Sequence, residues 1–369
     1  LERGGRMSHS EHLLTPILCS KGCLWSSAPD THAFVTRGSC YDGDSNLRRV
    51  GPRVVEVLAM VELVELSPRW ALQGLDAVVP LEVKLRLCRQ LRDAGFRRIE
   101  ATALVTGVPQ FADGPRLLAA LSLESGIWRA AAAGPDEAEA AVETGAGEVA
   151  VVALPEDLGP AVPDVIYDRL ATRAGSGASR DGDWPGRLEA AVEQTVAALR
   201  RLRHYPVRTV GVLPAALGHP GEAADGWLPR LTEAAERLAD AGADELSLVD
   251  AWGLGTPERL RLALDALTRR LPDARLAVQP RGLPDRSLAS VQRAVHSGAV
   301  ALECALPLVP GGPWGLAGTR QVLSWLARLG PPLEVAGPPL AEAELILAVA
   351  SSRWSRPDNR AATREREEA

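Results

Sequence analysis

Histidine and cysteine are scarce in this sequence. Its 369 residues include six histidines, three of them before residue 54, and five cysteines. Five scattered cysteines do not form a disulfide framework, and they suit a reducing compartment. Cys19, Cys23, His32 and Cys40 could be arranged around zinc, but one Cys-x3-Cys pair without a second close pair is a weak zinc pattern. We interpret these four residues as part of an unstructured leader.

An excess of basic residues and a long apolar run are also missing. The formal net charge is -6 and the pI is about 5.7, which argues against nucleic acid as a main partner. No run approaches about 18 consecutive apolar residues, so no membrane span is predicted. No targeting signal is clear, because a mitochondrial presequence would be richer in Arg and poorer in acidic residues than residues 1–50. We expect a protein of the cytoplasm or the mitochondrial matrix.

What the sequence does contain is a regular alternation of strands and helices. Short β-branched or apolar runs alternate with Ala-, Leu- and Arg-rich stretches of helical period, and a glycine often lies between a helix and the next strand. Eight such units with short connections predict a closed (β/α)8 TIM barrel, an α/β fold. The predicted strands are residues 61–66, 98–102, 128–132, 148–153, 208–213, 245–249, 275–278 and 300–306.

The same alternation sets the expected domain boundaries. We expect a flexible leader over residues 1–53, the barrel over residues 54–330, a C-terminal extension over residues 331–350 and a charged tail over residues 351–369. Residues 171–187 are rich in Gly, Ser and Asp, and they predict a loop after the fourth strand.

In such a barrel, chemistry takes place at the carboxyl ends of the strands. The candidate catalytic residues there are Arg69, Glu100, Asp250 and Arg281. Three further residues are candidates for substrate binding, namely Gln73, Thr102 and Gln279. Glu65, Glu100 and Asp250 could offer oxygens to a cation, but Arg281 would repel one. No metal ligand is assigned.

Several motifs resemble one known family, the 3-hydroxy-3-methylglutaryl-CoA (HMG-CoA) lyases. Residues 64–73 read VELSPRWALQ and are similar to the family's first-strand signature, Glu-x-(Gly/Ser)-Pro-Arg-Asp-Gly-Leu-Gln. Four further segments keep the family's order and spacing: 99–102 (IEAT), 108–110 (VPQ), 216–220 (ALGHP) and 250–257 (DAWGLGTP). The resemblance covers roughly residues 54–330 and implies a TIM barrel of the pyruvate carboxyltransferase type.

The resemblance also implies an activity. The family cleaves HMG-CoA to acetyl-CoA and acetoacetate, in leucine breakdown and ketone-body formation, with Mg or Mn as the cofactor. An arginine, here Arg69, and the cation stabilise the enolate that forms. An acyl-CoA thioester or a small carboxylate is the expected ligand, and a homodimer is one possible assembly.

The pattern breaks at the metal site. The family's metal-binding Asp corresponds to Trp70, and its His-x-His pair corresponds to Gln279 and Arg281. The Asn ligand falls near Thr319, and the loop cysteine corresponds to Gly312. We therefore expect no metal cofactor and a catalytically impaired protein, a pseudoenzyme. Two alternatives stay open, an active lyase with metal-independent chemistry and a metal-dependent lyase whose ligands lie elsewhere.

Two of the retained or substituted arginines have structural interpretations as well. Arg69 could act on substrate, or it could pair with Glu100 and seal the barrel mouth. Arg281 could neutralise the carboxylates that a metal ion would otherwise neutralise, or it could hold a substrate carboxylate.

Overall fold

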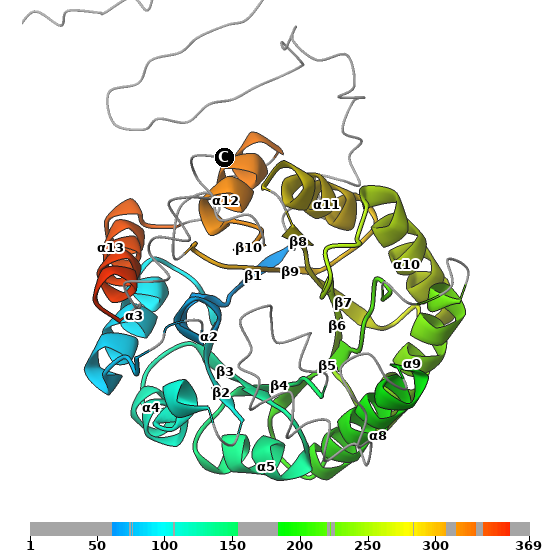
Figure 1. Ribbon diagram of the computed structural model, residues 1–369, viewed down its shortest axis with the longest axis horizontal. Helices are drawn as coiled ribbons and strands as arrows, with labels where there is room; N and C mark the ends of the chain where they lie inside the picture. Colours follow the sequence, from blue (N-terminus) through cyan, green and yellow to red (C-terminus); the bar gives the residue numbers. More distant parts are fainter. Residues whose placement is uncertain are drawn as a thin grey trace, which may run out of the picture. The chain divides into compact units, whose positions relative to one another are not determined.

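Eight parallel strands close into a barrel in the order β1-β2-β3-β4-β5-β6-β7-β9 (Figure 1). The computed structural model describes residues 61–73, 75, 77–105, 108–153, 184–219, 222, 226–282, 284–307, 315–329 and 335–354. The barrel closes where β9 pairs with both β1 and β7. The strands are β1 (Glu62–Glu65), β2 (Arg98–Leu104), β3 (Ile127–Ala132), β4 (Glu148–Val151), β5 (Arg208–Leu213), β6 (Glu245–Val249), β7 (Arg275–Gln279) and β9 (Ala301–Cys304). The predicted TIM barrel is confirmed.

Helices surround the strands on the outside of the barrel (Figure 1). The longer helices are α3 (Leu81–Asp93), α4 (Gly114–Leu121), α5 (Pro135–Glu143), α8 (Trp184–Leu202), α9 (Trp227–Ala241), α10 (Pro257–Arg270), α11 (Pro284–His296), α12 (Thr319–Leu329) and α13 (Gly337–Trp354). Two short ones are α2 (Ser67–Gln73) and the 3-10 turn η1 (Pro109–Phe111), and β8 (Arg281–Gly282) pairs antiparallel with β10 (Gly315–Leu316). No helix in the described part of the chain is long and apolar enough to cross a membrane.

The start of α10 and the end of α9 have capping residues in the expected geometry. The side chain of Thr256 caps α10 by accepting from the Arg259 backbone N–H at 3.0 Å, and Pro257 fills the first turn. Gly242 ends α9 with φ of 101°, a left-handed conformation that glycine adopts without steric cost. Local sequence therefore determines where α10 begins and where α9 ends.

Three segments differ from the sequence prediction. α2 lies directly after β1, in a stretch for which no helix is predicted. α8 begins at Trp184, inside the predicted loop over residues 171–187, while residues 171–183 lie outside the described part. α13 extends to Trp354, into the predicted charged tail, and contacts α3 through the ion pair of Glu342 with Arg86. The predicted leader, residues 1–53, lies outside the described part as well.

The apolar core lies between the strands and the helices. Leucine, valine and alanine side chains from both layers are buried there, including Leu87 of α3, Leu199 of α8 and Leu238 of α9. TIM barrels usually fill the space inside the strands with branched apolar side chains as well. Here that space holds valines such as Val210 and Val249 and small residues such as Ala131 and Ala150, together with long charged side chains. The barrel interior therefore combines apolar and charged groups.

Candidate functional site at the carboxyl end of the barrel

The site begins with the short helix α2, which carries Arg69, Trp70 and Gln73. These residues were predicted at the end of the first strand, but the chain turns into a helix at Ser67 instead. Glu65 promotes this turn because its Oε1 accepts from the Ser67 backbone N–H at 3.1 Å. A carboxylate at a helix N-terminus satisfies a backbone donor that the helix itself leaves unpaired. The helix thus brings Arg69 over the barrel.

Arg69 forms a buried ion pair with Glu100 of β2. Its Nε donates to Glu100 Oε1 at 2.5 Å, and both side chains are almost fully buried. Arg69 also donates from Nη1 to Gln73 Oε1 at 3.2 Å. The second oxygen of Glu100 lies 2.7 Å from Nε of Arg129 on β3. Glu100 is therefore shared between two arginines.

Arg281 and Trp70 lie together at the same end of the barrel. The guanidinium of Arg281 is 4.6 Å from the centroid of the Trp70 ring, and that of Arg69 is 5.5 Å from it. Cations over an indole face are attracted by its quadrupole. With the Gln279 amide oriented to suit its neighbours, its oxygen accepts from Arg281 Nη2 and its nitrogen donates to Glu303 Oε2, each at 3.1 Å. Gln279 thus links Arg281 to the barrel interior.

Arg129 completes a continuous polar network. Its Nη1 donates to Glu303 at 2.6 Å, so that Arg129 joins the Glu303 side of the site to Glu100. Burial alone would lower the pKa of Arg129, but the charges of Glu303 and Glu100 outweigh burial and raise the pKa above its ordinary value. Arg129 is a permanently charged group at the centre of this network.

The two other predicted site residues contact different parts of the chain. Asp250 Oδ2 accepts from the Gly255 backbone N–H at 3.0 Å, which holds the turn after β6. Thr102 lies against Gly114 of α4, because an irregularity in the pairing of β2 and β3 between Glu100 and Thr102 changes which side chains face inward. The structure thus brings together Arg69, Gln73, Glu100, Gln279 and Arg281 but does not place Thr102 with them.

Glu65 was named from the sequence only as a possible oxygen donor to a cation, and no catalytic or substrate-binding role was predicted for it. It is fully buried, and its Oε2 accepts from the Thr319 hydroxyl at 2.6 Å, while Oε1 accepts from the Leu306 backbone N–H at 3.4 Å. These bonds connect β1 with the end of β9 and the start of α12. Burial raises the pKa of Glu65 to about 7, against the lowering effect of its hydrogen bonds to Ser67 and Thr319. Its protonation state therefore changes near neutral pH.

Three aromatic side chains cluster after the fourth to sixth strands. The rings of Trp184 and His219 stack at 3.7 Å, and Trp252 meets both edge-on, at 5.1 and 4.8 Å. His219 therefore has an aromatic, largely apolar neighbourhood.

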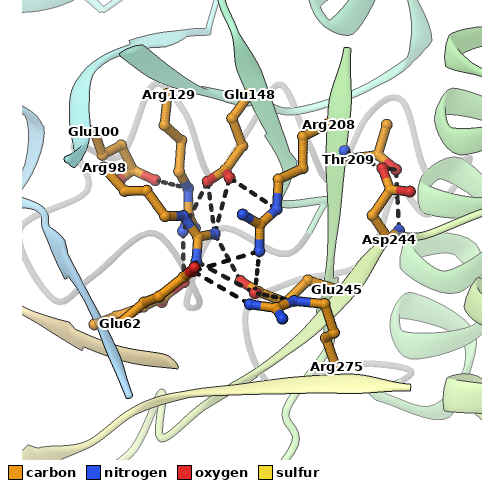
Figure 2. A network of polar contacts seen from close by, with 11 residues as sticks. Glu62, Arg98, Glu100, Arg129, Glu148, Arg208, Thr209, Asp244, Glu245 and Arg275 are labelled. Carbon is orange, nitrogen blue, oxygen red and sulfur yellow. Dashed lines mark hydrogen bonds and ion pairs between the residues drawn. The ribbon is translucent and has the colours of Figure 1, made fainter. Parts of the chain in front are cut away.

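A column of alternating charges continues from the site to the other end of the barrel (Figure 2). Arg98 Nη2 lies 2.9 Å from Glu148 and 2.7 Å from Glu245, both fully buried. Five arginines and five glutamates make up this column: Arg69, Arg98, Arg129, Arg208, Arg275, Glu62, Glu100, Glu148, Glu245 and Glu303. Sequence offered a signal for it, because six of the eight barrel strands open on Glu or Arg.

The residues predicted to stand at the family's metal-ligand positions include none, in the described part of the chain, that joins a group of three metal-binding side chains. Within the described residues, no group of three His, Cys, Asp or Glu side chains converges in a way that could hold a metal ion. Glu100 is taken up by two arginines, and Thr319, near the expected position of an Asn ligand, donates to Glu65. Gly312, at the position of the family's loop cysteine, lies outside the described part.

Comparisons with known proteins find hydroxymethylglutaryl-CoA lyases both among curated relatives and among solved structures. No family model matches the chain. The mitochondrial hydroxymethylglutaryl-CoA lyase of Mus musculus is 28% identical over 297 residues, which cover 78% of this chain and 85% of the relative. The cytoplasmic 3-hydroxy-3-methylglutaryl-CoA lyase of the same species is 25% identical over 269 residues, 71% of each chain.

Solved structures give the same result. The hydroxymethylglutaryl-CoA lyase of Pseudomonas aeruginosa superposes with a TM-score of 0.63 at 25% identity, over 84% of this chain and 98% of that one. The HMG-CoA lyase of Brucella melitensis superposes with a TM-score of 0.63 at 22% identity, over 79% and 99% of the two chains, and supports the fold alone.

Proposed function

This chain belongs to the HMG-CoA lyase family of TIM barrels, and from that premise we propose that it is a lyase-like protein without the family's metal-dependent activity. The observation that carries the proposal is the double ion pairing of Glu100. Both of its oxygens face arginines, Arg69 at 2.5 Å and Arg129 at 2.7 Å, where a metal-dependent site would direct carboxylate oxygens at a cation.

The remaining groups do not fit a divalent ion. Trp70 has no lone pair to offer, and the Gln279 oxygen accepts from Arg281. Arg281 carries a permanent positive charge that would repel a cation nearby. We propose that the guanidiniums of Arg69, Arg129 and Arg281 supply the positive charge that a metal ion supplies in the family, so that the barrel is stable without one.

Replacing a metal ion with arginines lowers the expected rate of cleavage. A metal ion acts as a Lewis acid on the substrate's oxygens and contributes several kcal/mol to stabilising the enolate. If that contribution is about 5 kcal/mol, its loss corresponds to a rate decrease of roughly 10³ to 10⁴. Trp70 adds a large indole to the space beside Arg69 and Arg281, which reduces the room for substrate.

A second candidate function follows from the same pair of arginines. Two guanidiniums over one indole could bind a carboxylate or a developing enolate, because Arg donates in a planar fork that matches such oxygens. A metal-independent lyase acting on an acyl-CoA thioester or a small carboxylate would use this feature. Glu65, which titrates near neutral pH in the same end of the barrel, gives this alternative a proton carrier.

The deciding experiment is an assay of HMG-CoA cleavage with purified protein, with added Mn²⁺ and with a chelator. The Pseudomonas aeruginosa lyase serves as the active control. We expect a rate at least roughly 10³ below the control, unchanged by Mn²⁺ or chelator. Cleavage at an ordinary rate that the chelator abolishes would contradict the proposal. Cleavage at a rate near that of the control and insensitive to chelator, or a thermal shift with an acyl-CoA thioester or small carboxylate, would support the metal-independent alternative.

A further inference from the structure

Three arginines converge on one carboxylate at the amino-terminal end of the barrel, opposite the site described above (Figure 2). Glu62 Oε2 lies 2.9 Å from Arg98, 3.2 Å from Arg275 and 3.7 Å from Arg208. Such a convergence of guanidiniums is how proteins bind carboxylates and phosphates. Here the bound oxygen belongs to the protein's own side chain.

Glu62 differs from the other carboxylates of the charged column in its exposure. Its side chain is 43% exposed, whereas those of Glu148 and Glu245 are fully buried behind it. A fully buried carboxylate cannot leave its arginines without a large desolvation penalty. Glu62 can instead move into solvent, since it stands at the open end of the barrel.

An open surface depression of about 520 Å³ lies at this group. Glu62, Arg208 and Arg275 line it, together with Tyr205 and Asp244. The two other polar groups in the lining are already engaged, because the Tyr205 hydroxyl donates to Glu139 at 2.5 Å and Asp244 accepts from the Thr209 backbone and hydroxyl. The arginines are thus the groups in this lining that suit an oxyanion.

The charge balance points the same way. The five arginines of the column are matched by its five glutamates only when Glu62 is counted, so its departure leaves the column with one net positive charge, against the carboxylate of Asp244 in the lining. Among the described residues, the buried Nε of Arg275, which is part of the lining, has no hydrogen-bond acceptor. An anion with several oxygens could accept from this Nε as well as from the groups that Glu62 Oε2 contacts.

We propose that the amino-terminal end of the barrel is an oxyanion-binding site, which Glu62 occupies in the free protein and which a phosphate-sized anion takes when this side chain moves out. The ligand class is an inorganic phosphate or the phosphoryl group of a small molecule. This proposal is independent of the lyase-like function, since the site lies at the other end of the barrel.

The test compares phosphate binding by the wild-type protein and by Glu62→Ala, using calorimetric titration and thermal unfolding at constant ionic strength. We expect Glu62→Ala to bind inorganic phosphate about tenfold or more tightly than wild type, because no internal carboxylate competes. It should unfold at a lower temperature than wild type in chloride, and phosphate should restore the loss by binding to the native state. If the variant folds only in phosphate, the site is supported when the phosphate dependence of folding saturates and is lost on adding Arg275→Gln.

Two controls separate binding from a general salt effect. Phosphate stabilises most proteins by exclusion from their surface, so Glu258→Ala, at an exposed ion pair on α10, measures that background. In Glu62→Ala with Arg275→Gln, the saturable response should disappear. No saturable phosphate response in either wild type or Glu62→Ala, or a response that survives Arg275→Gln, would overturn the proposal. A phosphate monoester tested in parallel tells whether free phosphate or a phosphorylated molecule binds more tightly.

Discussion

The guanidinium of Arg281 lies over the indole of Trp70, 4.6 Å from the ring centroid. These are two of the residues that replace metal ligands in the family pattern, and they contact one another. Their contact suggests that the two substitutions act together. The Trp70 indole stabilises the Arg281 guanidinium through a cation–π contact, and the guanidinium supplies the positive charge that a metal ion would supply.

Substitution of Arg281 tests this structural role. Arg281→Ala should lower the free energy of unfolding by about 1–3 kcal/mol, because it removes a buried charge-assisted hydrogen bond to Gln279 and the contact with Trp70. Chemical denaturation measures this difference. Arg201→Ala, which removes an exposed ion pair with Asp136, should change stability much less, because solvent screens that pair. Equal effects of the two substitutions would show that Arg281 is not a structural replacement for the ion.

Arg129 should be more critical, since it carries the positive charge between Glu100 and Glu303. Arg129→Ala leaves both buried carboxylates without this partner and should cost about 3–5 kcal/mol. Arg129→Met combined with Glu303→Gln should cost less, because the double change also removes one of the charges left behind. Denaturant unfolding compares the two variants, and a double variant less stable than Arg129→Ala would refute the ionic explanation.

Glu65 predicts an unusual pH dependence. Its pKa in the folded protein is about 7, raised from 4.5, so its contribution to stability is fully present below about pH 4.5 and is lost as the pH rises through 7. A shift of this size corresponds to about 3 kcal/mol between these limits. Glu65→Gln should therefore be more stable than wild type at pH 8 and lack this slope between pH 5 and 8.

Thermal unfolding across that pH range checks the prediction. Glu258→Gln is a suitable control, because Glu258 lies on the surface and its hydrogen bond with Arg261 lowers its pKa. A wild-type protein whose stability does not fall relative to Glu65→Gln above pH 5 would mean that Glu65 is stabilised as a carboxylate.

Restoring the family's ligands should restore metal binding. The triple variant Trp70→Asp, Gln279→His, Arg281→His puts a carboxylate and two imidazoles at the substituted positions, and it removes the repelling guanidinium. We expect it to bind Mn²⁺ in a calorimetric titration. The double variant that keeps Trp70 should bind more weakly. A folded triple variant with no affinity for Mn²⁺ would show that these positions were assigned incorrectly.

Sequence periodicity predicts most of the fold because strands and helices bury their apolar faces at different spacings. The strands over residues 208–213 and 245–249 have the predicted bounds. α2 could not be predicted from periodicity, since it is seven residues long and depends on a hydrogen bond from the Ser67 backbone to Glu65. The periodicity of apolar residues does not predict such a hydrogen bond.

The site was predictable only where a residue stands in a recognisable motif. Arg69 and Glu100 could be named together because the family pattern holds both, and their ion pair agrees with the structural interpretation of Arg69. Arg129 and Glu303 belong to no motif, and their contact joins strands 174 residues apart in the sequence. Thr102 faces α4 because of an irregularity in strand pairing, which the side-chain alternation of β2 does not reveal.

The loss of the metal site is tested most directly by the Mn²⁺ content of the wild-type protein after equilibration with excess Mn²⁺ and removal of unbound metal. We expect no stoichiometric metal, because Glu100 is held by two arginines and Arg281 carries a positive charge beside Trp70. One tightly bound Mn²⁺ per chain, released by chelator together with HMG-CoA cleavage activity, would contradict it.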